Sequence, residues 1–491
     1  MSEREREARR VRLEALREAG IDPFPARVAA RERVAGVKER FANHDEQALE
    51  ADPVTVSLAG RLMALRPMGK LVFGTLLEDG ERIQISARKS EIPAELFAAV
   101  KSLDVGDFLH VEGPLWRTRK GELTVDLRGF QLLAKSLAPL PEKWHGLKDV
   151  EVRFRKRHLD ILVNEDARRI MLQRSAVVRT MREVLDARGF LEVETPVLQP
   201  IYGGAAARPF TTEHNAYDQR LFLRISDELY LKRLVVAGLD RVYEIGRVFR
   251  NEGVSRKHNP EFTMMECYQA YADYRDMMEL TQSLVQTICD QVFGTRQLPY
   301  RGEVIDFDGD WLQLSMRDAI AERIGVDVLD CPDLPSLQQA LRDSGREPGE
   351  APTWGRLVDD LFSEHVEPQL IQPTFVTDYP LELSPLAKRS PADPRLVERF
   401  EAFVGGLEVA NAFSELNDPL DQRGRLEAAH RDRDAGDDEA HPMDEDYLEA
   451  LEIGLPPTGG LGVGVDRLVM VLVDAPNLRE VISFPHMRPD D

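Results

Sequence analysis

Hydrophobic positions follow two different periods along the chain and divide it into two parts. From residue 54 to residue 133 they alternate with polar positions, as in VTVSLAGRLMAL (54–65) and GKLVFGTLLE (69–78), which is typical of half-buried strands. A helical pattern, IPAELFAAVKSL (92–103), separates three such strands from two later ones. This order within about 80 residues predicts an OB-fold barrel, whose open face binds single-stranded nucleic acid.

The second part of the chain mixes helical and strand-like segments and predicts an α+β fold. A helical pattern covers 168–189, and strand-like runs recur at 373–380, 407–416 and 461–473. An acidic stretch, 430–446, is expected to be a surface loop or a solvated face. The expected organisation is a helical extension (1–50), the barrel (51–135), a linker (136–160) and a large domain (161–491) with a smaller inserted segment around 300–360.

Composition places the chain among folded multidomain proteins. Its 491 residues are too many for a single hydrophobic core. A composition of 43% hydrophobic and 31% charged residues excludes disorder and fibrous structure. No run approaches the roughly 18 apolar residues of a membrane span, and the charged N-terminus lacks the apolar segment of a secretory signal. The cytoplasm is therefore the expected location. Cys267, Cys289 and Cys331 form no CxxC pair, which argues against disulfides and structural zinc.

The net charge of −22 is unevenly distributed. Residues 1–150 hold 25 Lys and Arg against 24 Asp and Glu, so the acidic excess lies in the remainder. Because an acidic surface repels a polyanion, the N-terminal part is the better candidate for contact with nucleic acid.

One block, RVFRNEGVSRKHNPEFTMME (247–266), has the components of a nucleotide site. Arg250 and Glu252 are expected on one face of a strand, and Phe262 and Glu266 on one face of the return strand. They offer a cation for phosphate, acceptors for an exocyclic amine and an aromatic ring for stacking. A surface hairpin with cross-strand ion pairs is the alternative. The chain contains no P-loop, HExxH or GxSxG motif.

Three segments, taken together, resemble the signature motifs of class II aminoacyl-tRNA synthetases. They are GFLEVETP (189–196), the block at 247–266 and GLGVGVDRLVM (460–470). Further stretches, among them FSELNDP (413–419) and DEDYLEALEIGLPPTGG (444–460), make the whole chain similar to bacterial-type lysyl-tRNA synthetases. The resemblance implies an N-terminal OB-fold followed by a catalytic domain built on an antiparallel sheet flanked by helices.

The resemblance also implies the reaction. Members of the family activate L-lysine with ATP to lysyl-adenylate, transfer lysine to the 3′ end of lysine tRNA, and release AMP and pyrophosphate. They use Mg²⁺, and the first motif, ending at Pro196, corresponds to a homodimer interface.

The site residues follow from the same resemblance, residue by residue. The catalytic arginines would be Arg250 and Arg467. ATP would be bound by these two together with Glu252, His258, Asn259 and Phe262. Lysine would be bound by Gly204, Glu228, Glu266, Tyr268, Asn411, Phe413 and Glu415. Glu401 and Glu408 would hold Mg²⁺. Their spacing of seven is compatible with one helical face, which equally describes a solvated stripe.

The barrel is expected to read a U-rich anticodon. Arg66, Phe73, Gln84 and Glu122 match the family's anticodon contacts, with Phe73 as the stacking platform, although a lone aromatic residue on a strand is more often part of a core.

Two alternatives remain beside the lysine enzyme. The first is a relative specific for aspartate or asparagine, against which Glu266 and Glu415 argue because those substrates require cationic or amide partners. The second is a catalytically silent RNA-binding paralogue, which would be expected to lose Arg250 or Arg467. A relative that lysylates a protein factor lacks the barrel.

Overall fold

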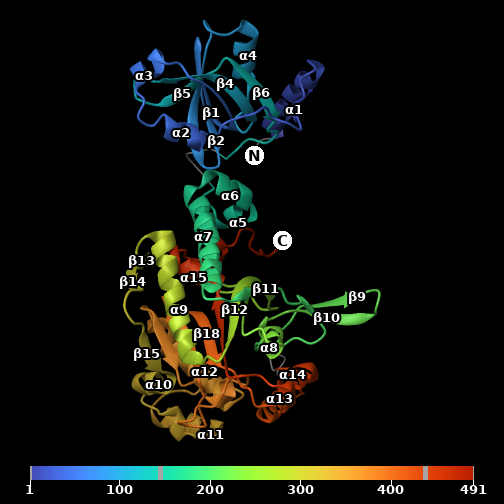
Figure 1. Cartoon of the computed structure of the whole chain (residues 1–491), viewed down its shortest axis with the longest axis vertical. Coiled ribbons are helices and arrows are strands. Elements are labelled where there is room, and N and C mark those ends of the chain that lie inside the picture. The colour runs from blue at the N-terminus through green and yellow to red at the C-terminus, as the bar shows by residue number, and fades with distance from the viewer. Residues whose placement is uncertain (1–2, 142–146, 435–440, 490–491) are drawn as a thin grey trace. The chain divides into compact units, whose positions relative to one another are not determined.

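The computed structural model describes residues 3–141, 147–434 and 441–489 (Figure 1). The chain divides into two compact units, Met1–Gly146 and Leu147–Asp491, and each is described by itself. None of the described helices is long and apolar enough to cross a membrane.

The first unit is a barrel of six strands. Their order is β1-β2-β3-β5-β4-β6, and an antiparallel pairing of β1 with β4 closes the sheet. Alternate side chains of each strand, such as Val72 and Leu76 on β2, fill the interior. The last predicted strand is two strands in the structure, β5 and β6. The elements are β1 Thr55–Met68, β2 Leu71–Glu78, β3 Glu81–Arg88, α4 Ala94–Ser102, β4 Phe108–Arg117, β5 Leu123–Asp126 and β6 Gly129–Ala134.

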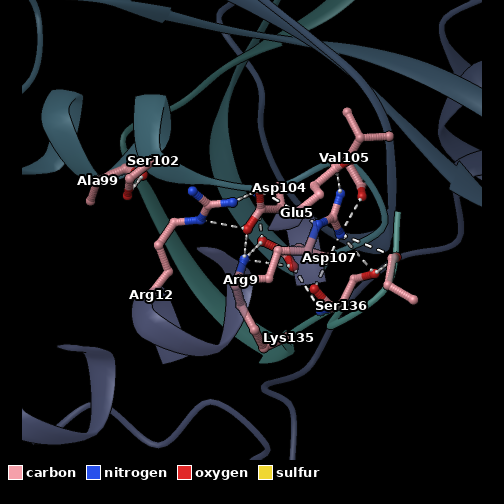
Figure 2. A network of polar contacts seen from close by, with 11 residues as sticks. Glu5, Arg9, Arg12, Ala99, Ser102, Asp104, Val105, Asp107, Lys135 and Ser136 are labelled. Atoms are coloured by element: carbon pink, nitrogen blue, oxygen red, sulfur yellow. Dashed lines mark hydrogen bonds and ion pairs between the residues drawn. The ribbon is translucent and has the colours of Figure 1, made fainter. Parts of the chain in front are cut away.

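Three helices precede the barrel: α1 Glu3–Glu18, α2 Val34–Arg40 and α3 Glu46–Ala51. Figure 2 shows how a polar network fastens α1 to the barrel. Arg9 is only 3% exposed and donates to the carbonyl oxygens of Val105 and Ser136, each at 3.1 Å. Lys135, at the end of β6, donates to Asp104 at 2.5 Å and to Asp107 at 2.8 Å. The helix is therefore held by buried charges rather than by a broad apolar face.

The second unit is built on a mixed sheet in which eight of the described strands take part. The order is β15-β16-β17-β18-β19-β12-β11-β7, antiparallel except for the outer pairs β15–β16 and β11–β7. One face packs against the helices α7 Glu165–Ala187, α9 Tyr274–Ile288 and α15 Val465–Leu472. The strands are β7 Leu191–Glu192, β11 Arg241–Phe249, β12 Glu261–Ala270, β15 Leu312–Ser315, β16 Thr374–Thr377, β17 Arg399–Val404, β18 Leu407–Ser414 and β19 Thr458–Gly464.

Strand alternation separates the core from the other face of this sheet. On β12, Met265 and Cys267 are fully buried in the core under the helices, whereas Met264 and Glu266 point to the opposite face. That opposite face forms the wall of a cavity, so the central strands carry both the hydrophobic core and the candidate site.

Smaller elements surround the sheet. Residues from α10 Met316–Ile324, α11 Leu334–Asp343 and α12 Trp354–His365 form a core of their own next to the sheet. The remaining elements are α5 Val150–Arg155, α6 Arg157–Val163, β8 Leu198–Gln199, β9 Thr211–His214, β10 Gln219–Leu223, α8 Glu228–Val236, a π-helical turn Cys289–Phe293, β13 Gln297–Tyr300, β14 Glu303–Asp306, α13 Pro419–Asp434, α14 Glu445–Ile453 and α16 Leu478–Val481, with short 3-10 turns Val328–Asp330, Glu367–Gln369 and Leu381–Leu383.

Two expected irregular segments contain helices. Helical structure begins at Val150, inside the segment expected to be a linker, where the Asp149 side chain accepts from the amides of Glu151 and Val152. In the acidic stretch, α13 extends to Asp434 and α14 begins at Glu445. The interpretation of 430–446 as a loop is therefore wrong at both ends, whereas the other interpretation, a solvated face, agrees with the exposure of Glu445 and Asp446. Residues 142–146 and 435–440 of these two segments lie outside the described part of the chain.

Replacing Lys135 by Met should destabilise the first unit by about 3 kcal/mol, because it leaves the fully buried Asp107 without its cation, whereas Asp104 keeps its ion pair with Arg12. Hydrogen exchange of the full-length chain should show lost protection in peptides from α1 and β6. Arg17→Ala is the control, since its ion pair with Glu14 is exposed and contributes little. Unchanged protection in Lys135→Met would contradict a clamping role for the network.

Candidate active site

The second unit contains a cavity of about 340 Å³ on the face of its sheet opposite α7, α9 and α15. Strands β12, β17, β18 and β19 contribute to its walls, together with the segments before and after β11. Of the residues that the sequence assigned to ATP, lysine and metal, all but Glu415 line it. They are Gly204, Glu228, Arg250, Glu252, His258, Asn259, Phe262, Glu266, Tyr268, Glu401, Glu408, Asn411, Phe413 and Arg467.

The nucleotide-like block has a different local structure from the expected one. Strand β11 ends at Phe249, so the placement of Arg250 and Glu252 on one strand was wrong. The chain turns there because the Asn251 amide donates to the Arg208 carbonyl at 2.7 Å. The turn places the Arg250 guanidinium 5.1 Å from the centre of the Phe262 ring. A cation and an aromatic face thus lie together, as the sequence predicted. Arg250 reaches Phe262 from the loop that follows β11 and not from the strand itself.

The loop that follows holds His258 and Asn259. Burial and the nearby Arg467 and Lys257 lower the pKa of His258 to about 4, so this ring is neutral at pH 7. The Asn259 amide nitrogen donates to the Glu261 carbonyl at 2.7 Å, which fixes the side chain. Its buried Oδ1 has no hydrogen-bond partner among the described residues. That oxygen is an acceptor available to a bound ligand.

One end of the cavity is acidic. Glu266 accepts from the Ser226 hydroxyl at 2.9 Å and from the Tyr268 hydroxyl at 3.4 Å. Burial and the neighbouring Glu228 raise the pKa of Glu266 to about 7. Glu228 is also buried, at the first turn of α8, and burial raises its pKa as well. Two carboxylates and a phenol therefore face the same small volume.

Glu415 lies directly behind this end, in the wall. Its side chain is fully buried, and its Oε1 has no hydrogen-bond partner among the residues described. A Cβ on Gly460 would come within 1.9 Å of Glu415 Oε1 and 2.6 Å of the Tyr268 ring. Gly460 lines the cavity, so the unpartnered oxygen is separated from the cavity only by a residue without a side chain.

Gly204 closes the acidic end from the opposite side. Its φ of +87° is a conformation that favours glycine, and a Cβ there would lie 2.8 Å from the Ser226 hydroxyl. Because Ser226 also orients Glu266, this glycine allows the loop at 204 to approach the carboxylates closely.

The candidate metal acids lie on strands and not on a helix, which corrects the sequence expectation. Glu401 is on β17, and Glu408 is the second residue of the return strand β18 after a tight turn. Burial and the charge of Glu408 raise the pKa of Glu401 to about 7. Glu408 in turn accepts from Arg467 at 2.9 Å. A seven-residue spacing brings two side chains together here because a hairpin reverses the chain.

Arg399 is a cavity residue that sequence reasoning missed. Its guanidinium donates to Glu401 at 2.5 Å, to Asn411 Oδ1 at 3.0 Å and to Ser384 Oγ at 2.8 Å. It thereby fixes the predicted lysine-site asparagine and a predicted metal acid at once. The only sequence signal was its position two residues before Glu401, on the same face of a strand.

Lys232 was also missed. Its side chain is fully buried and forms ion pairs with Glu228, at 2.5 Å, and with Glu415. From the sequence, a lysine four residues after a glutamate reads as an exposed helical ion pair. Nothing local indicates that this pair is buried.

The anticodon candidates gather on the outer face of the barrel. Arg66 on β1 is the cross-strand partner of Phe73 on β2. Gln84, on the same face of β3, accepts from Thr124 at 3.0 Å, and Glu122 is exposed just before β5. The face also carries Trp116, which was not predicted, and whose indole donates to Ser86 at 3.1 Å. Ser86 is the cross-strand partner of Phe73, so the two aromatic residues flank one strand.

Comparison with known proteins agrees with both units. A family model for tRNA synthetases class II (D, K and N) matches residues 149–488, and one for the OB-fold nucleic acid binding domain matches 56–136. A lysine–tRNA ligase from Roseiflexus castenholzii is 53% identical over 483 residues, 98% of either chain. One from Staphylococcus aureus is 49% identical over 483 residues, 98% of this chain and 97% of its own. The predicted α+β fold, an OB-fold followed by a class II synthetase domain, is confirmed.

Replacing Gly460 by Ala should destabilise the second unit by about 2 kcal/mol, since the new methyl group would overlap Glu415 and Tyr268. Thermal unfolding of the full chain would measure the effect. Gly462→Ala on the same strand is the matched control, because there the nearest atom is the flexible end of Met264, at 3.2 Å. Equal stability of the two variants would show that the acidic end is not packed as described.

Proposed function

The chain belongs to the lysine–tRNA ligase family of the class II tRNA synthetases, and we propose that its cavity is where L-lysine and ATP react. In this reaction the lysine carboxylate forms a bond to the α-phosphorus of ATP and pyrophosphate leaves. A terminal hydroxyl of lysine tRNA then attacks the carbonyl carbon of lysyl-adenylate, and AMP leaves.

The observation that carries the assignment of the amino acid is the unpartnered carboxylate oxygen of Glu415. Glu228, Glu266 and Glu415 meet at one end of the cavity, and Lys232 is the cation paired with two of them. An ε-ammonium group, compact and with three donors, would supply the missing positive charge and the missing hydrogen bond. Gly204, Tyr268, Asn411 and Phe413 would complete the lysine pocket.

The other end of the cavity suits ATP. Arg250 would bind the α-phosphate and the lysine carboxylate, and Arg467 would bind the γ-phosphate, so positive charge surrounds the reacting centre. Phe262 would stack on adenine, with Glu252, His258 and Asn259 as polar partners. No residue forms a covalent intermediate in this scheme, and positioning together with charge stabilisation carries the step.

Glu401 and Glu408 would hold Mg²⁺. The pair fits that ion, because Mg²⁺ is usually bound by one or two carboxylates together with phosphate oxygens. The raised pKa of Glu401 beside Glu408 also indicates that a cation there would relieve repulsion. When bound, Mg²⁺ would neutralise phosphate charge, while Arg399 and Tyr379 hold Glu401 in place.

The barrel would recognise the U-rich anticodon of lysine tRNA. Phe73 would stack on a base, while Arg66, Gln84 and Glu122 contact base edges or phosphate. We further propose that the chain acts in the cytoplasm, where ATP, lysine and tRNA meet. It would act as a homodimer through the segment 189–196, in which Leu191 is 51% exposed.

The deciding experiment is amino-acid-dependent exchange of pyrophosphate into ATP without tRNA, across lysine, ornithine, arginine, aspartate and asparagine. Exchange with lysine alone supports the proposal. Exchange with aspartate or asparagine would assign the chain to that branch of the D, K and N family, and exchange with none would indicate a silent paralogue.

Glu415→Gln should raise the KM for lysine in the exchange assay by about 10- to 100-fold, since a buried hydrogen bond to a charged group contributes about 1.5–3 kcal/mol. The KM for ATP should change little, because Glu415 lies at the other end of the cavity from Arg467. An equal loss for both substrates would refute the pocket assignment.

Phe73→Ala should raise the KM for tRNA in aminoacylation by about 10- to 100-fold through the loss of a stacked base. Lysine-dependent exchange should remain intact, because adenylate formation needs only the second unit. Phe73→Tyr, which keeps an aromatic face, is the control. Loss of both activities in Phe73→Ala would make Phe73 a residue of folding rather than of recognition.

A further inference from the structure

The acidic end of the cavity contains a cation that the proposed reaction does not use. Lys232 lies on α8 with no exposed side-chain surface, and its Nζ bridges Glu228 of the same helix and Glu415 beyond β18. The aromatic rings of Phe413 and Tyr447 lie 5.4 and 5.8 Å from the same nitrogen. An internal ammonium thus occupies a site made of carboxylates and aromatic faces, the chemistry expected for the substrate.

The Lys232 ammonium group lies next to one carboxylate oxygen of Glu415 and leaves the other without a cation. Neither oxygen has a hydrogen-bond partner in the described chain, but Oε2 forms an ion pair with Lys232, whereas Oε1 is directed to Gly460. If Lys232 were neutral, two buried carboxylates would lose their cation. Each would then bind a proton at neutral pH more readily than before. A protonated carboxyl group has no negative charge, so it attracts a substrate ammonium group much more weakly than a carboxylate does.

Burial disfavours the charged form of Lys232, but Glu228 and Glu415 outweigh it and raise its pKa well above the usual value. Burial, together with Glu228 and Glu266, raises the pKa of Glu415 well above its usual value, and the charge of Lys232 opposes that shift. The lysine therefore stays charged over any pH at which the enzyme is assayed, and it acts on its neighbours as a fixed charge.

We propose that Lys232 is a positioning residue for lysine selection, which keeps Glu228 and Glu415 ionised and turns Glu415 Oε1 toward the substrate ammonium. The inference rests on the proposed function, since it gives the internal lysine a role at the same pocket. It goes further in assigning the charge state of the pocket to a residue that need not touch the substrate.

Other charged and titratable groups also face this cluster, so the test must separate the effect of Lys232 from theirs. His441 and Tyr447 face Lys232 from the segment that leads into α14 and from α14 itself. Glu266 faces Glu415 from β12, and Arg399 faces Glu228 from β17. A pH dependence of the KM for lysine is attributable to Lys232 only if the variant without Lys232 shows this dependence and the wild type does not.

The first test uses Lys232→Met, which keeps the length of the side chain and removes its charge. At pH 7.5 the KM for lysine in the exchange assay should rise at least about 30-fold, as expected when a buried ion pair loses one partner, with the KM for ATP within about threefold of wild type. Because carboxyl groups deprotonate as pH rises, the lysine KM of the variant should fall from pH 7 to pH 9 relative to wild type. A purely structural role would not produce this pH dependence.

Three comparisons support the interpretation. Lys232→Arg keeps the charge and should retain most of the affinity for lysine. Lys135→Met removes the other buried lysine described above, in the barrel unit, and should leave both KM values unchanged. In Lys232→Ala, propylammonium should restore lysine-dependent exchange in a saturable way, whereas 1-propanol, of similar size but neutral, should not.

Specific outcomes would overturn the inference. An unchanged or lower KM for lysine in Lys232→Met would do so, as would rescue of Lys232→Ala by 1-propanol. If circular dichroism shows that the Met variant does not fold, Lys232→Gln, which keeps hydrogen-bond donors for both acids without the charge, replaces it. A KM for lysine equal to that of the wild type in Lys232→Gln would also overturn the inference. Absence of lysine-dependent exchange in the wild type itself would refute the proposed function instead, so the two failures are distinguishable.

Discussion

The repulsion among three carboxylates buried at one end of a cavity is the constraint on which the catalytic unit depends. Each has lost most of its hydration, and each raises the pKa of its neighbours. The surrounding structure offsets this with Lys232 between Glu228 and Glu415 and with the Ser226 hydroxyl and Asp227 amide on Glu266. Among the described residues, both oxygens of Glu415 still lack a hydrogen-bond partner, and only Oε2 has the ion pair with Lys232.

The sheet makes this arrangement possible by bringing distant segments into register. Glu266 on β12 lies opposite Gly462 on β19, which lies opposite Asn411 on β18. On these strands one face is apolar and packs under α7, α9 and α15, so the polar face can be devoted to the cavity. Glycines on β19 are required for the same reason, since a side chain at Gly460 would fill the space into which Glu415 reaches.

Sequence patterns predicted the barrel and the α+β class because alternation and helical periodicity are local properties. The resemblance to synthetases named residues that the fold then gathers around one cavity. The residue pattern placed Arg250 and Glu252 on one strand, which ends at Phe249. The spacing of Glu401 and Glu408 suggested one helical face, whereas a hairpin joins them. Sequence patterns did not identify Lys232, because its pairing with Glu228 has the spacing of an ordinary exposed helical ion pair. They did not identify Arg399 either, because Ser384 and Asn411, two of its partners, are more than ten residues away in the chain.

In the proposed reaction, the buried carboxylates at one end of the cavity and the arginines that line it elsewhere would act on different groups of the substrate. A lysine molecule whose ammonium is drawn to Glu228, Glu266 and Glu415 has its carboxylate directed away from them, toward Arg250 and Arg467, where the phosphates of ATP would lie. Aspartate would meet repulsion at the acidic end and could not adopt this orientation. In the proposed reaction these charges would both select the substrate and align the attacking group, so a change in the charge of the acidic end should alter specificity and reactivity together.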